Sequence, residues 1–497
     1  MDISEESYRT EQLNNILKYH ELGYESYPHK YETNINIEQF IKKYENNFEK
    51  GNRQKELIYK IAGRVIEKRN LGKKLYFYKI SSNGFNLQLL LDVKEYKNPE
   101  EFTQINNLVH RGDIIWADGF AGRSNPGELS LYVTNLIILT PCLKLLPKQY
   151  FGLKNPEIRF QKRYLDMISN TNIINNFKIC NKITKFIRNY LDDLEFIEVN
   201  TPIINTKFGG ATAKPFKTYH NDLKQDMFLR IAPEIFLKKL IIGGFEKIYE
   251  IGKQFRNENY DNYHSPEFSS LELYWSYSDY ENLIILCQDL LSKLVLSING
   301  SLILNYLGKI IDFTLPFKQI DILSTLEIKT GKKFDFVSFE NDDFYQFLSN
   351  LCEENNIECS NPKTIPRLLD KLIGHFIEPD CKNPTFLINH PLIMSPLAKF
   401  HRKNPKLSER FELFIDGKEY ANAYTELNNP ISQEKSFRLQ QIDKGIGDEE
   451  IPLPDEDYIE ALEYGLPPTG GCGFGLDRIM MLLTNNQNIK EVITFPL

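Results

Sequence analysis

The segment YEIGKQFRNENYDNYHSPEFSSLELYWSY, residues 249–277, carries the features that decide how this chain folds and acts. Its charged residues stand close together with one aromatic residue: Arg256, Glu258, His264, Phe268 and Glu272. A solvated hairpin would show similar charges. However, apolar residues flank these charges on both sides, and a buried arginine or glutamate normally needs a partner. The segment therefore favours buried, paired charges, with a solvent-facing hairpin as the alternative.

A second segment, RFELFIDGKEYANAYTELN at residues 410–428, predicts a β-hairpin with two carboxylates on one side. Asp416-Gly417 is a strong two-residue turn signal. Centred there, Phe414 faces Glu419, which puts Glu412 and Glu419 diagonally on one face. Two close carboxylates repel each other unless a cation or proton lies between them, and Mg²⁺ is bound by carboxylates together with phosphates. Two solvent-facing glutamates remain the alternative.

The same hairpin predicts an irregularity in its second strand. Asn422, Tyr424 and Glu426 alternate onto one face, but their parity is opposite to that of Glu419. If both sets line one pocket, the strand needs a β-bulge near Tyr420–Ala421.

A third segment, LEYGLPPTGGCGFGLDRIMMLL at residues 462–483, crowds glycines into a turn before an apolar helix that opens at Leu476-Asp477-Arg478. Small residues let a ligand approach the backbone closely, and Arg478 then lies near the helix start. A plain glycine-rich turn is the alternative. Neither GxGxxG after a strand nor GxxxxGK[ST] occurs, which argues against a Rossmann or P-loop nucleotide site.

The composition is that of a folded protein without a membrane segment. Of 497 residues, 41% are apolar and 12% aromatic, enough for sizeable cores. There is no apolar run of about 18 residues and no signal-peptide or transit-peptide pattern at the N-terminus. The seven cysteines form no CxxC pair, so we expect reduced thiols, with neither a zinc site nor a disulfide framework. These features predict a cytoplasmic location.

The order of expected elements divides the chain into four parts. Residues 1–50 are expected to be a polar helical segment. Residues 51–145 hold five strand-like runs with a helical insert from Pro99 to Leu108, which predicts a small barrel of the OB-fold type, with a β-sandwich as the alternative. Residues 146–172 are expected to form a linker, and residues 173–497 an α+β domain with an antiparallel sheet flanked by helices.

The charge distribution adds a hint of RNA binding. The net charge is −7, yet residues 51–150 carry 15 Lys and Arg against 9 Asp and Glu. A mildly basic module beside an acidic body could bind RNA locally, although chance would also produce such a fluctuation.

Taken together, the three segments resemble motifs 2 and 3 and the intervening metal-binding strand of the class II aminoacyl-tRNA synthetases. FRNE is similar to the core of motif 2, and GFGLDR to motif 3. RYLDMI, GGATAKPF, RIAPE, HPLIMSPLAK and NAYTELN resemble segments of the lysyl-tRNA synthetase family specifically. The resemblance runs from about residue 8 to the terminal FPL.

The resemblance implies an ATP site with Mg²⁺. Arg256 bridges the lysine carboxylate and the α-phosphate, and adenine stacks between Phe268 and Arg478. Glu258 accepts from the adenine amino group, and His264 with Arg478 meets the γ-phosphate side. The implied metal ligands are Glu412 and Glu419. The implied ATP-binding set is Arg256, Glu258, His264, Phe268, Glu412, Glu419, Asn422 and Arg478, of which Arg256, Arg478, Glu412 and Glu419 are the catalytic residues.

The resemblance also implies a lysine pocket, and simple electrostatics supports it. A buried ε-ammonium needs acceptors, which Glu426 and Tyr274 supply together with Glu272 and Tyr424. Glu234 receives the α-ammonium. A loop at Gly209, Gly210 and Ala211 closes over the ligand, and Arg256 and Asn422 complete the lysine-binding set. An acidic pocket argues against the related aspartate and asparagine enzymes, because burying like charges together costs several kcal/mol.

In this family the barrel reads the anticodon of tRNA(Lys), and motif 1 forms a homodimer. The positions that match anticodon contacts are Arg64, Phe77, Gln88 and Glu128, with Phe77 as the stacking platform. Core packing for Phe77 and a surface turn for Glu128 are the alternatives. Motif 1 is the helix FKICNKITKFIRNYLDDL followed by EFIEVNTPII. Membership of a multi-synthetase complex stays open.

Two departures from the family pattern stand out. Glu195 replaces a usual glycine and is strained if that position has φ > 0. Ser265 replaces a usual asparagine and is too short for the same contact. A catalytically silent paralogue should have lost Arg256, Glu412, Glu419 or Arg478, and all are present. An amide-forming relative should lack the barrel.

Overall fold

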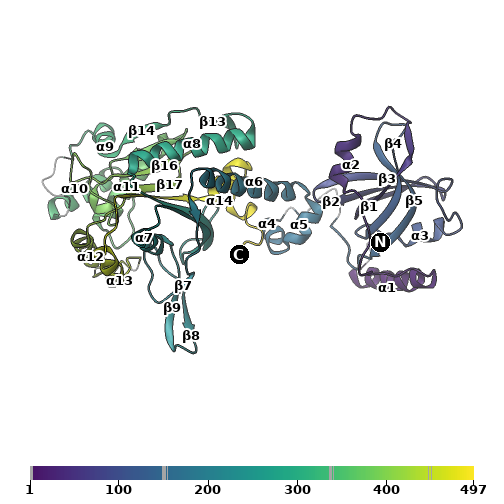
Figure 1. Ribbon diagram of the computed structural model, residues 1–497, viewed down its shortest axis with the longest axis horizontal. Helices are drawn as coiled ribbons and strands as arrows, with labels where there is room; N and C mark the ends of the chain where they lie inside the picture. Colours follow the sequence, from purple (N-terminus) through teal and green to yellow (C-terminus); the bar gives the residue numbers. More distant parts are fainter. Residues whose placement is uncertain are drawn as a thin grey trace. The chain divides into compact units, whose positions relative to one another are not determined.

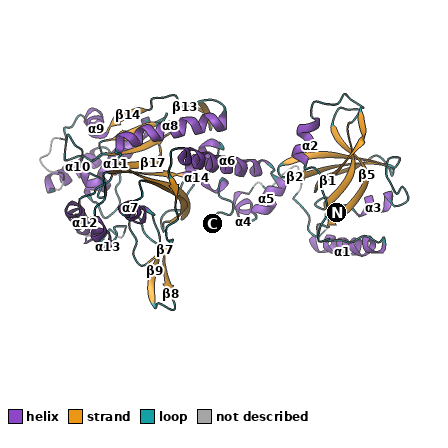
Figure 2. Cartoon of the chain, in the orientation of Figure 1, coloured by secondary structure: helices purple, strands orange, loops and turns teal. Residues whose placement is uncertain are grey.

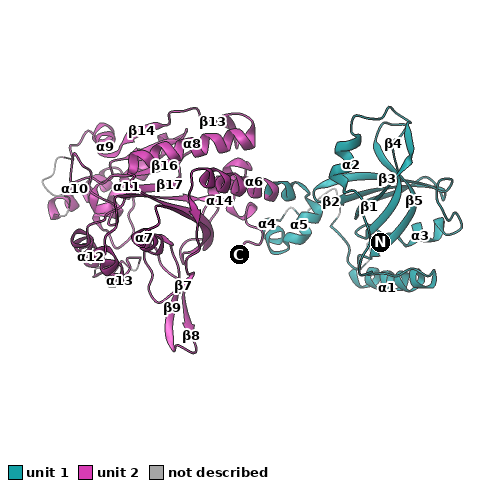
Figure 3. Cartoon of the chain, viewed as in Figure 1, with its two compact units in different colours: residues 1–176, 497 teal, residues 177–496 magenta. Residues whose placement is uncertain are grey.

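The chain forms two compact units, residues 1–176 with residue 497, and residues 177–496 (Figure 3). The computed structural model describes residues 4–147, 153, 155–334, 339, 341–445, 447–448 and 450–497. The predicted linker at 146–172 includes residues 148–152 and 154, which lie outside the described residues. In the described ranges, no helix combines the length and apolar character needed to cross a bilayer.

The first unit contains a closed barrel, built in its described residues from five strands in the order β1-β2-β3-β5-β4. The strands are β1 (Arg53–Asn70), β2 (Leu75–Ser82), β3 (Phe85–Asp92), β4 (Ile114–Arg123) and β5 (Leu129–Thr140). The helices are α1 (Glu5–Glu21), α2 (Ile37–Tyr44), α3 (Phe102–Leu108), α4 (Pro156–Gln161) and α5 (Arg163–Ser169). This confirms the predicted five-stranded barrel with a helical insert, and its closure excludes the sandwich.

Alternating residues explain why this barrel closes. In β2 the side chains of Tyr76, Tyr78 and Ile80 are buried inside, whereas Phe77 lies on the outer face and is only half-buried. The β2–β3 turn is Asn83-Gly84, and both residues have positive φ (52° and 83°), as a tight hairpin turn requires.

The second unit is built on a sheet with the order β14-β15-β16-β17-β18-β11-β10-β6 in its described part. The strands are β6 (Ile197–Glu198), β10 (Lys247–Phe255), β11 (Glu267–Ser276), β14 (Lys318–Asp321), β15 (Thr385–Ile388), β16 (Arg410–Ile415), β17 (Lys418–Thr425) and β18 (Thr469–Gly475). The strands from β15 to β10 pair antiparallel, and the end strands β14 and β6 pair parallel. This confirms the predicted antiparallel sheet.

Helices cover both faces of this sheet (Figures 1 and 2). One face packs on α6 (Asn172–Asp193), α8 (Tyr280–Asn299) and α14 (Leu476–Leu483) around a large apolar core. On the opposite face, α7 (Glu234–Ile242), α12 (Pro430–Gly445) and α13 (Glu456–Glu463) pack through a smaller cluster that includes Ile248 and Tyr274.

Smaller elements complete the second unit. They are the sheet of β7 (Ile204–Asn205), β8 (Lys217–His220) and β9 (Gln225–Leu229), the hairpin of β12 (Ile303–Tyr306) and β13 (Lys309–Asp312), helices α9 (Ile322–Thr330), α10 (Asp342–Glu354) and α11 (Ile365–Phe376), and the short helices η1 (Glu378–Asp380), η2 (Leu392–Met394) and η3 (Ile489–Glu491).

The hairpin of β16 and β17 has the predicted register and the predicted bulge. Phe414 pairs with Glu419, but Leu413 pairs with Ala421, so Tyr420 is an extra residue in β17. The bulge reverses the parity of β17. Glu419 and Asn422 can therefore face the same side of the sheet, although residues three positions apart face opposite sides in a regular strand.

Candidate functional site

A cavity of about 700 Å³ opens on the face of the sheet away from α8, and every residue predicted for ATP, lysine or metal lines it. They are Gly209, Gly210, Ala211, Glu234, Arg256, Glu258, His264, Phe268, Glu272, Tyr274, Glu412, Glu419, Asn422, Tyr424, Glu426 and Arg478. Three segments that are distant in sequence thus meet at one place.

Strand alternation explains which side chains reach the cavity. In β11, Leu271 and Leu273 belong to the apolar core under α8, so Glu272 and Tyr274 point the other way. In β17, Ala423 enters the core, and Asn422 and Tyr424 line the cavity. The same division into a core face and a cavity face holds for β18, because its pairing with β11 and with β17 shows no register shift.

Cationic and aromatic side chains gather at one end of the cavity. The guanidinium of Arg256 lies 5.1 Å from the ring centre of Phe268, a cation–π contact. Arg478 donates from Nη1 to the carbonyl oxygen of Glu419 (2.6 Å) and lies 3.2 Å from Nε2 of His264. Nδ1 of His264 is 2.9 Å from Asp261. These donors form a surface suited to phosphate oxygens.

The two glutamates predicted as metal ligands have different environments. Arg410 donates to Glu412 (2.5 Å), and Nε2 of His390 is 3.2 Å from the same carboxylate. Although burial opposes ionisation, Arg410 and His390 hold the pKa of Glu412 at about 2. Burial raises the pKa of Glu419, and the neighbouring charge of Glu412 adds to that rise. The sequence prediction included neither Arg410 nor His390, although Arg410 shares the strand face of Glu412.

A further carboxylate, Glu378, faces this pair. Burial, together with the negative charges of Asp370, Glu412 and Glu419, raises the pKa of Glu378 to about 7. The described residues include no group of His, Cys, Asp and Glu that could hold a metal ion by itself. These carboxylates could contribute oxygen ligands to a divalent ion whose further ligands are the oxygens of a polyphosphate.

The other end of the cavity is acidic and aromatic. The hydroxyl of Tyr424 donates to both oxygens of Glu234 (2.8 Å each), and the hydroxyl of Tyr274 lies 3.4 Å from Glu272. Burial raises the pKa of Glu272 to about 8, with the charge of Glu234 as the next cause. Glu426 is buried in the same wall. This end can surround a cationic group with carboxylate and hydroxyl oxygens.

Glycines in β18 and in the loop before α7 make room for these side chains. A Cβ at Gly471 would overlap Oε1 of Glu426 and come within 2.7 Å of the Tyr274 ring. Gly210 has a φ of 83°, and a Cβ there would lie 2.9 Å from that of Glu234. The glycine-rich turns therefore shape the acidic end.

Two charged residues behind the cavity escaped the sequence prediction. Lys238, one helical turn after Glu234, forms buried ion pairs with Glu234 and Glu426. Arg230 donates to Glu250 (2.5 Å), which also accepts from the backbone and hydroxyl of Thr201. The i,i+4 spacing of Glu234 and Lys238 could have indicated their ion pair from the sequence, because residues four positions apart on a helix lie side by side.

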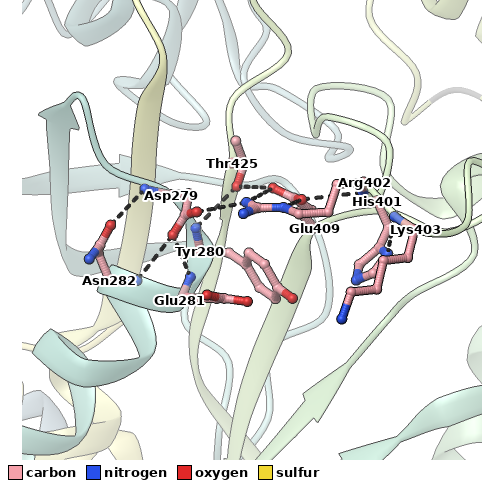
Figure 4. A network of polar contacts seen from close by, with 9 residues as sticks. All are labelled: Asp279, Tyr280, Glu281, Asn282, His401, Arg402, Lys403, Glu409 and Thr425. Atoms are coloured by element: carbon pink, nitrogen blue, oxygen red, sulfur yellow. Dashed lines mark hydrogen bonds and ion pairs between the residues drawn. The ribbon is translucent and has the colours of Figure 1, made fainter.

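A polar network anchors the strand end that carries Glu426 (Figure 4). Glu409 accepts hydrogen bonds from Arg402 and from the hydroxyl of Thr425, and Arg402 also donates to Asp279 (2.6 Å). The backbone of Tyr280 donates to Thr425 (3.0 Å). The start of α8 and the end of β17 are thereby tied together.

The residues predicted for the anticodon all lie in the first unit. Phe77 and Gln88 are half-buried on the outer face of the barrel, and Gln88 donates to Ser130 (2.8 Å). Arg64 donates to the carbonyl of Gly112 (2.7 Å). Glu128 is exposed in the β4–β5 turn. Ser265, which replaces the usual asparagine, lines the cavity of the second unit and is buried.

Comparison with known proteins places the chain in a family. Residues 155–497 match the model for tRNA synthetases class II (D, K and N). The chain is 44% identical to a lysine–tRNA ligase of Cladosporium cladosporioides, over 95% of this chain and 81% of the relative. It is 42% identical to a probable cytoplasmic lysine–tRNA ligase of Vairimorpha ceranae, over 100% and 96% of the two chains. A lysine–tRNA ligase of Thermotoga maritima is 40% identical, over 99% and 95%.

Proposed function

Since this chain belongs to the class II tRNA synthetases for aspartate, lysine and asparagine, and within them to the lysine–tRNA ligases, we propose that it charges tRNA(Lys) with lysine. L-lysine reacts with ATP to give lysyl-adenylate and pyrophosphate. A ribose hydroxyl of the 3′-terminal adenosine of the tRNA then attacks the lysyl carbonyl carbon, and AMP leaves. The observation that carries this proposal is the acidic end of the cavity, formed by Glu234, Glu272 and Glu426.

The acidic end selects lysine over the other two amino acids of the family. The ε-ammonium of lysine binds Glu426 and Tyr274 with support from Glu272, and the α-ammonium binds Glu234. An aspartate side chain in this place would bury a carboxylate among carboxylates, which costs several kcal/mol. Asparagine has an uncharged side chain and cannot supply the acidic end with an ε-ammonium.

Activation requires two anions to approach each other. An oxygen of the lysine carboxylate attacks the α-phosphorus, and pyrophosphate leaves with its bonding electrons. Arg256 neutralises the carboxylate and the α-phosphate together, and its planar fork fixes their orientation. Phe268 and Arg478 hold the adenine ring between them, and Glu258 reads its amino group. His264 and Arg478 contact the far phosphates.

Magnesium is the proposed cofactor. Glu412 and Glu419 would hold the ion, which would supply charge neutralisation on the phosphates of ATP. Arg410 and His390 keep Glu412 ionised and oriented. Asn422, whose side-chain oxygen accepts from Arg410 (3.0 Å), completes this wall. Removal of Mg²⁺ with EDTA should abolish pyrophosphate exchange, and added Mg²⁺ should restore it.

The remaining proposals concern the rest of the molecule. The barrel reads the anticodon through Phe77, Gln88, Arg64 and Glu128.

Two chains associate through motif 1. This segment contains the edge strand β6 of the described sheet, in which Ile197 is 52% exposed. We also propose a cytoplasmic location, which the names of the relatives from Vairimorpha ceranae and Encephalitozoon cuniculi give for those proteins. Sedimentation equilibrium tests the dimer.

The decisive experiment is ATP–pyrophosphate exchange with each of the twenty amino acids, in Mg²⁺ and without tRNA. Exchange with lysine alone is the expected result. Exchange with aspartate or asparagine would overturn the assignment of the acidic end. A folded protein that exchanges with none of them would be a silent paralogue, and the enzyme proposal would fail.

A further inference from the structure

The acidic end of the cavity contains a cation of its own. Lys238 in α7 is completely buried, and its ammonium forms ion pairs with Glu234 and Glu426. The ring centres of Tyr424 and Tyr458 lie 5.6 Å and 5.7 Å from its Nζ. Burying a lysine costs free energy unless partners match its charge. The position of Lys238 beside the carboxylates that we propose to bind the substrate therefore calls for an explanation.

The two oxygens of Glu426 have different neighbours. Oε2 faces the ammonium of Lys238. Oε1 lies against Gly471 of β18, next to the ring of Tyr274, and accepts no hydrogen bond from any described residue. Glu426 can therefore hold Lys238 through one oxygen and a second cation through the other.

Two carboxylates of the acidic end, those of Glu234 and Glu426, share the single ammonium of Lys238. The acidic end therefore keeps room for a further positive charge, which the ε-ammonium of lysine supplies.

We propose that Lys238 is the built-in counterion of the lysine pocket. Its ammonium fixes the carboxylates of Glu234 and Glu426 in place, so that Oε1 of Glu426 is left to bind the ε-ammonium of one lysine. Lys238 is thus a positioning residue, which acts on the substrate through the two glutamates. This inference rests on the proposed function and adds a determinant of specificity to it.

The electrostatics of Glu426 support the proposal. Burial raises the pKa of Glu426, the ammonium of Lys238 opposes that rise, and Glu234 and Glu272 add to it. Burial likewise works against the charge of Lys238, but Glu234 and Glu426 outweigh it and raise the pKa of that ammonium. The titratable groups around Glu426 are Glu234 and Lys238 from α7, Glu272 and Tyr274 from β11, Tyr424 from β17 and Tyr458 from α13.

The test is the pH dependence of lysine-dependent pyrophosphate exchange in Lys238→Met. Without the ammonium, the pKa of Glu426 rises further, and each unit of rise lowers its ionised fraction about tenfold at neutral pH. We expect the KM for lysine at pH 7 to increase by roughly tenfold or more. The increase in the KM for lysine should become smaller toward pH 9. The KM for ATP should stay within about twofold of the wild type, because the described contacts of Lys238 lie at the lysine end.

Matched variants separate this role from simple packing. Lys238→Arg keeps the charge and should restore the wild-type pH profile in large part. Lys239→Met alters the next residue of α7, which is partly exposed, and should behave as the wild type. Lys238→Gln is a second neutral variant that keeps hydrogen-bond donors, for use if the methionine variant does not fold.

The outcomes are distinct. A wild-type enzyme without lysine-dependent exchange would overturn the proposed function itself. A wild-type enzyme that exchanges, with folded Lys238→Met or Lys238→Gln showing the same pH profile and KM, would overturn only the counterion role. Tighter lysine binding in the neutral variants would also overturn it, because Lys238 would then be a competitor. Failure of both neutral variants to fold would assign Lys238 to the core and would overturn it as well.

Discussion

At the scale of single residues, the acidic end depends on glycines, whose lack of a side chain leaves room for its glutamates and tyrosines. β18 passes directly beside Glu426 and Tyr274, so only a residue without a side chain fits at Gly471. Two residues further, a Cβ at Gly473 would meet Cγ of Glu272 at 3.6 Å, which is an ordinary contact. The two glycines share a strand face but have different steric importance.

We therefore predict that Gly471→Ala impairs lysine binding much more than Gly473→Ala. Overpacking of this kind costs about 1–3 kcal/mol, enough to raise the KM for lysine by about tenfold or more. The KM for ATP should change little in either variant. Pyrophosphate exchange at varied lysine and varied ATP measures both constants, and equal effects of the two alanines would contradict the steric argument.

The raised pKa of Glu272 has a consequence for stability. Its pKa is about 8 in the folded protein and about 4.5 when unperturbed, so the folded state holds a proton that the unfolded state has lost. This contribution to stability is complete below pH 4.5 and is lost as the pH rises through 8. Without lysine, the melting temperature should therefore fall over this window, and Glu272→Gln should weaken the fall.

Thermal denaturation between pH 5 and pH 9 tests this prediction. Glu267→Gln is the control, since Glu267 lies on the same strand with its side chain 51% exposed. It should retain the pH dependence of the wild type. An unchanged pH dependence in Glu272→Gln would show that Glu272 ionises normally.

At the scale of elements, one turn and one bulge set the positions of whole strands. The bulge at Tyr420 lets β17 present Glu419, Asn422 and Tyr424 to the same cavity. The turn between α6 and β6 holds Glu195 at a φ of 64°, which confirms the strain expected where the family has glycine. The backbone of Glu195 donates to Asp192 (2.9 Å), as a helix C-terminus often requires.

Replacing Glu195 with glycine should therefore stabilise the protein. Relief of the left-handed strain exceeds the entropic cost of glycine, and we expect up to about 1 kcal/mol. The Glu195 side chain is 89% exposed and lies 3.9 Å from Lys247, so little else is lost. Asp193→Gly, at the end of α6, should instead destabilise by about 1 kcal/mol. Urea denaturation of both variants measures the difference, and a destabilising Glu195→Gly would contradict it.

At the scale of the whole molecule, the cavity and the barrel that we propose to read the anticodon belong to different compact units. The cavity lies in residues 177–496, and the barrel in residues 1–176. Each unit has its own apolar core. In the proposed function, activation of lysine needs only residues 177–496, whereas aminoacylation draws on both units. A change on the outer face of the barrel should therefore separate the two reactions.

Phe77→Ala provides that separation. Base stacking on an aromatic side chain contributes about 1–3 kcal/mol, so kcat/KM for tRNA(Lys) should fall by roughly tenfold or more. Lysine-dependent pyrophosphate exchange should remain at the wild-type rate. Leu71→Ala, at a residue that is 68% exposed in the β1–β2 turn, serves as the control. Normal aminoacylation by Phe77→Ala would remove Phe77 from the anticodon site.

The sequence by itself determined the local and periodic features. Short strand-like runs predicted the five barrel strands, and the Asp416-Gly417 turn predicted the pairing of Phe414 with Glu419. The parity of Asn422, Tyr424 and Glu426 predicted the nearby bulge. These features follow from backbone geometry over a few residues, which a single sequence displays directly. The order of motifs also identified the family.

Only the tertiary structure decided which charges meet. Lys238 reaches Glu426 although 188 positions along the chain separate them, and Arg410 with His390 fixes the ionisation of Glu412. Periodicity gives the face on which a side chain lies, but distance and burial arise when distant segments pack together. Because burial decides whether a charge needs a partner, the counterions of the site became visible only in the folded chain.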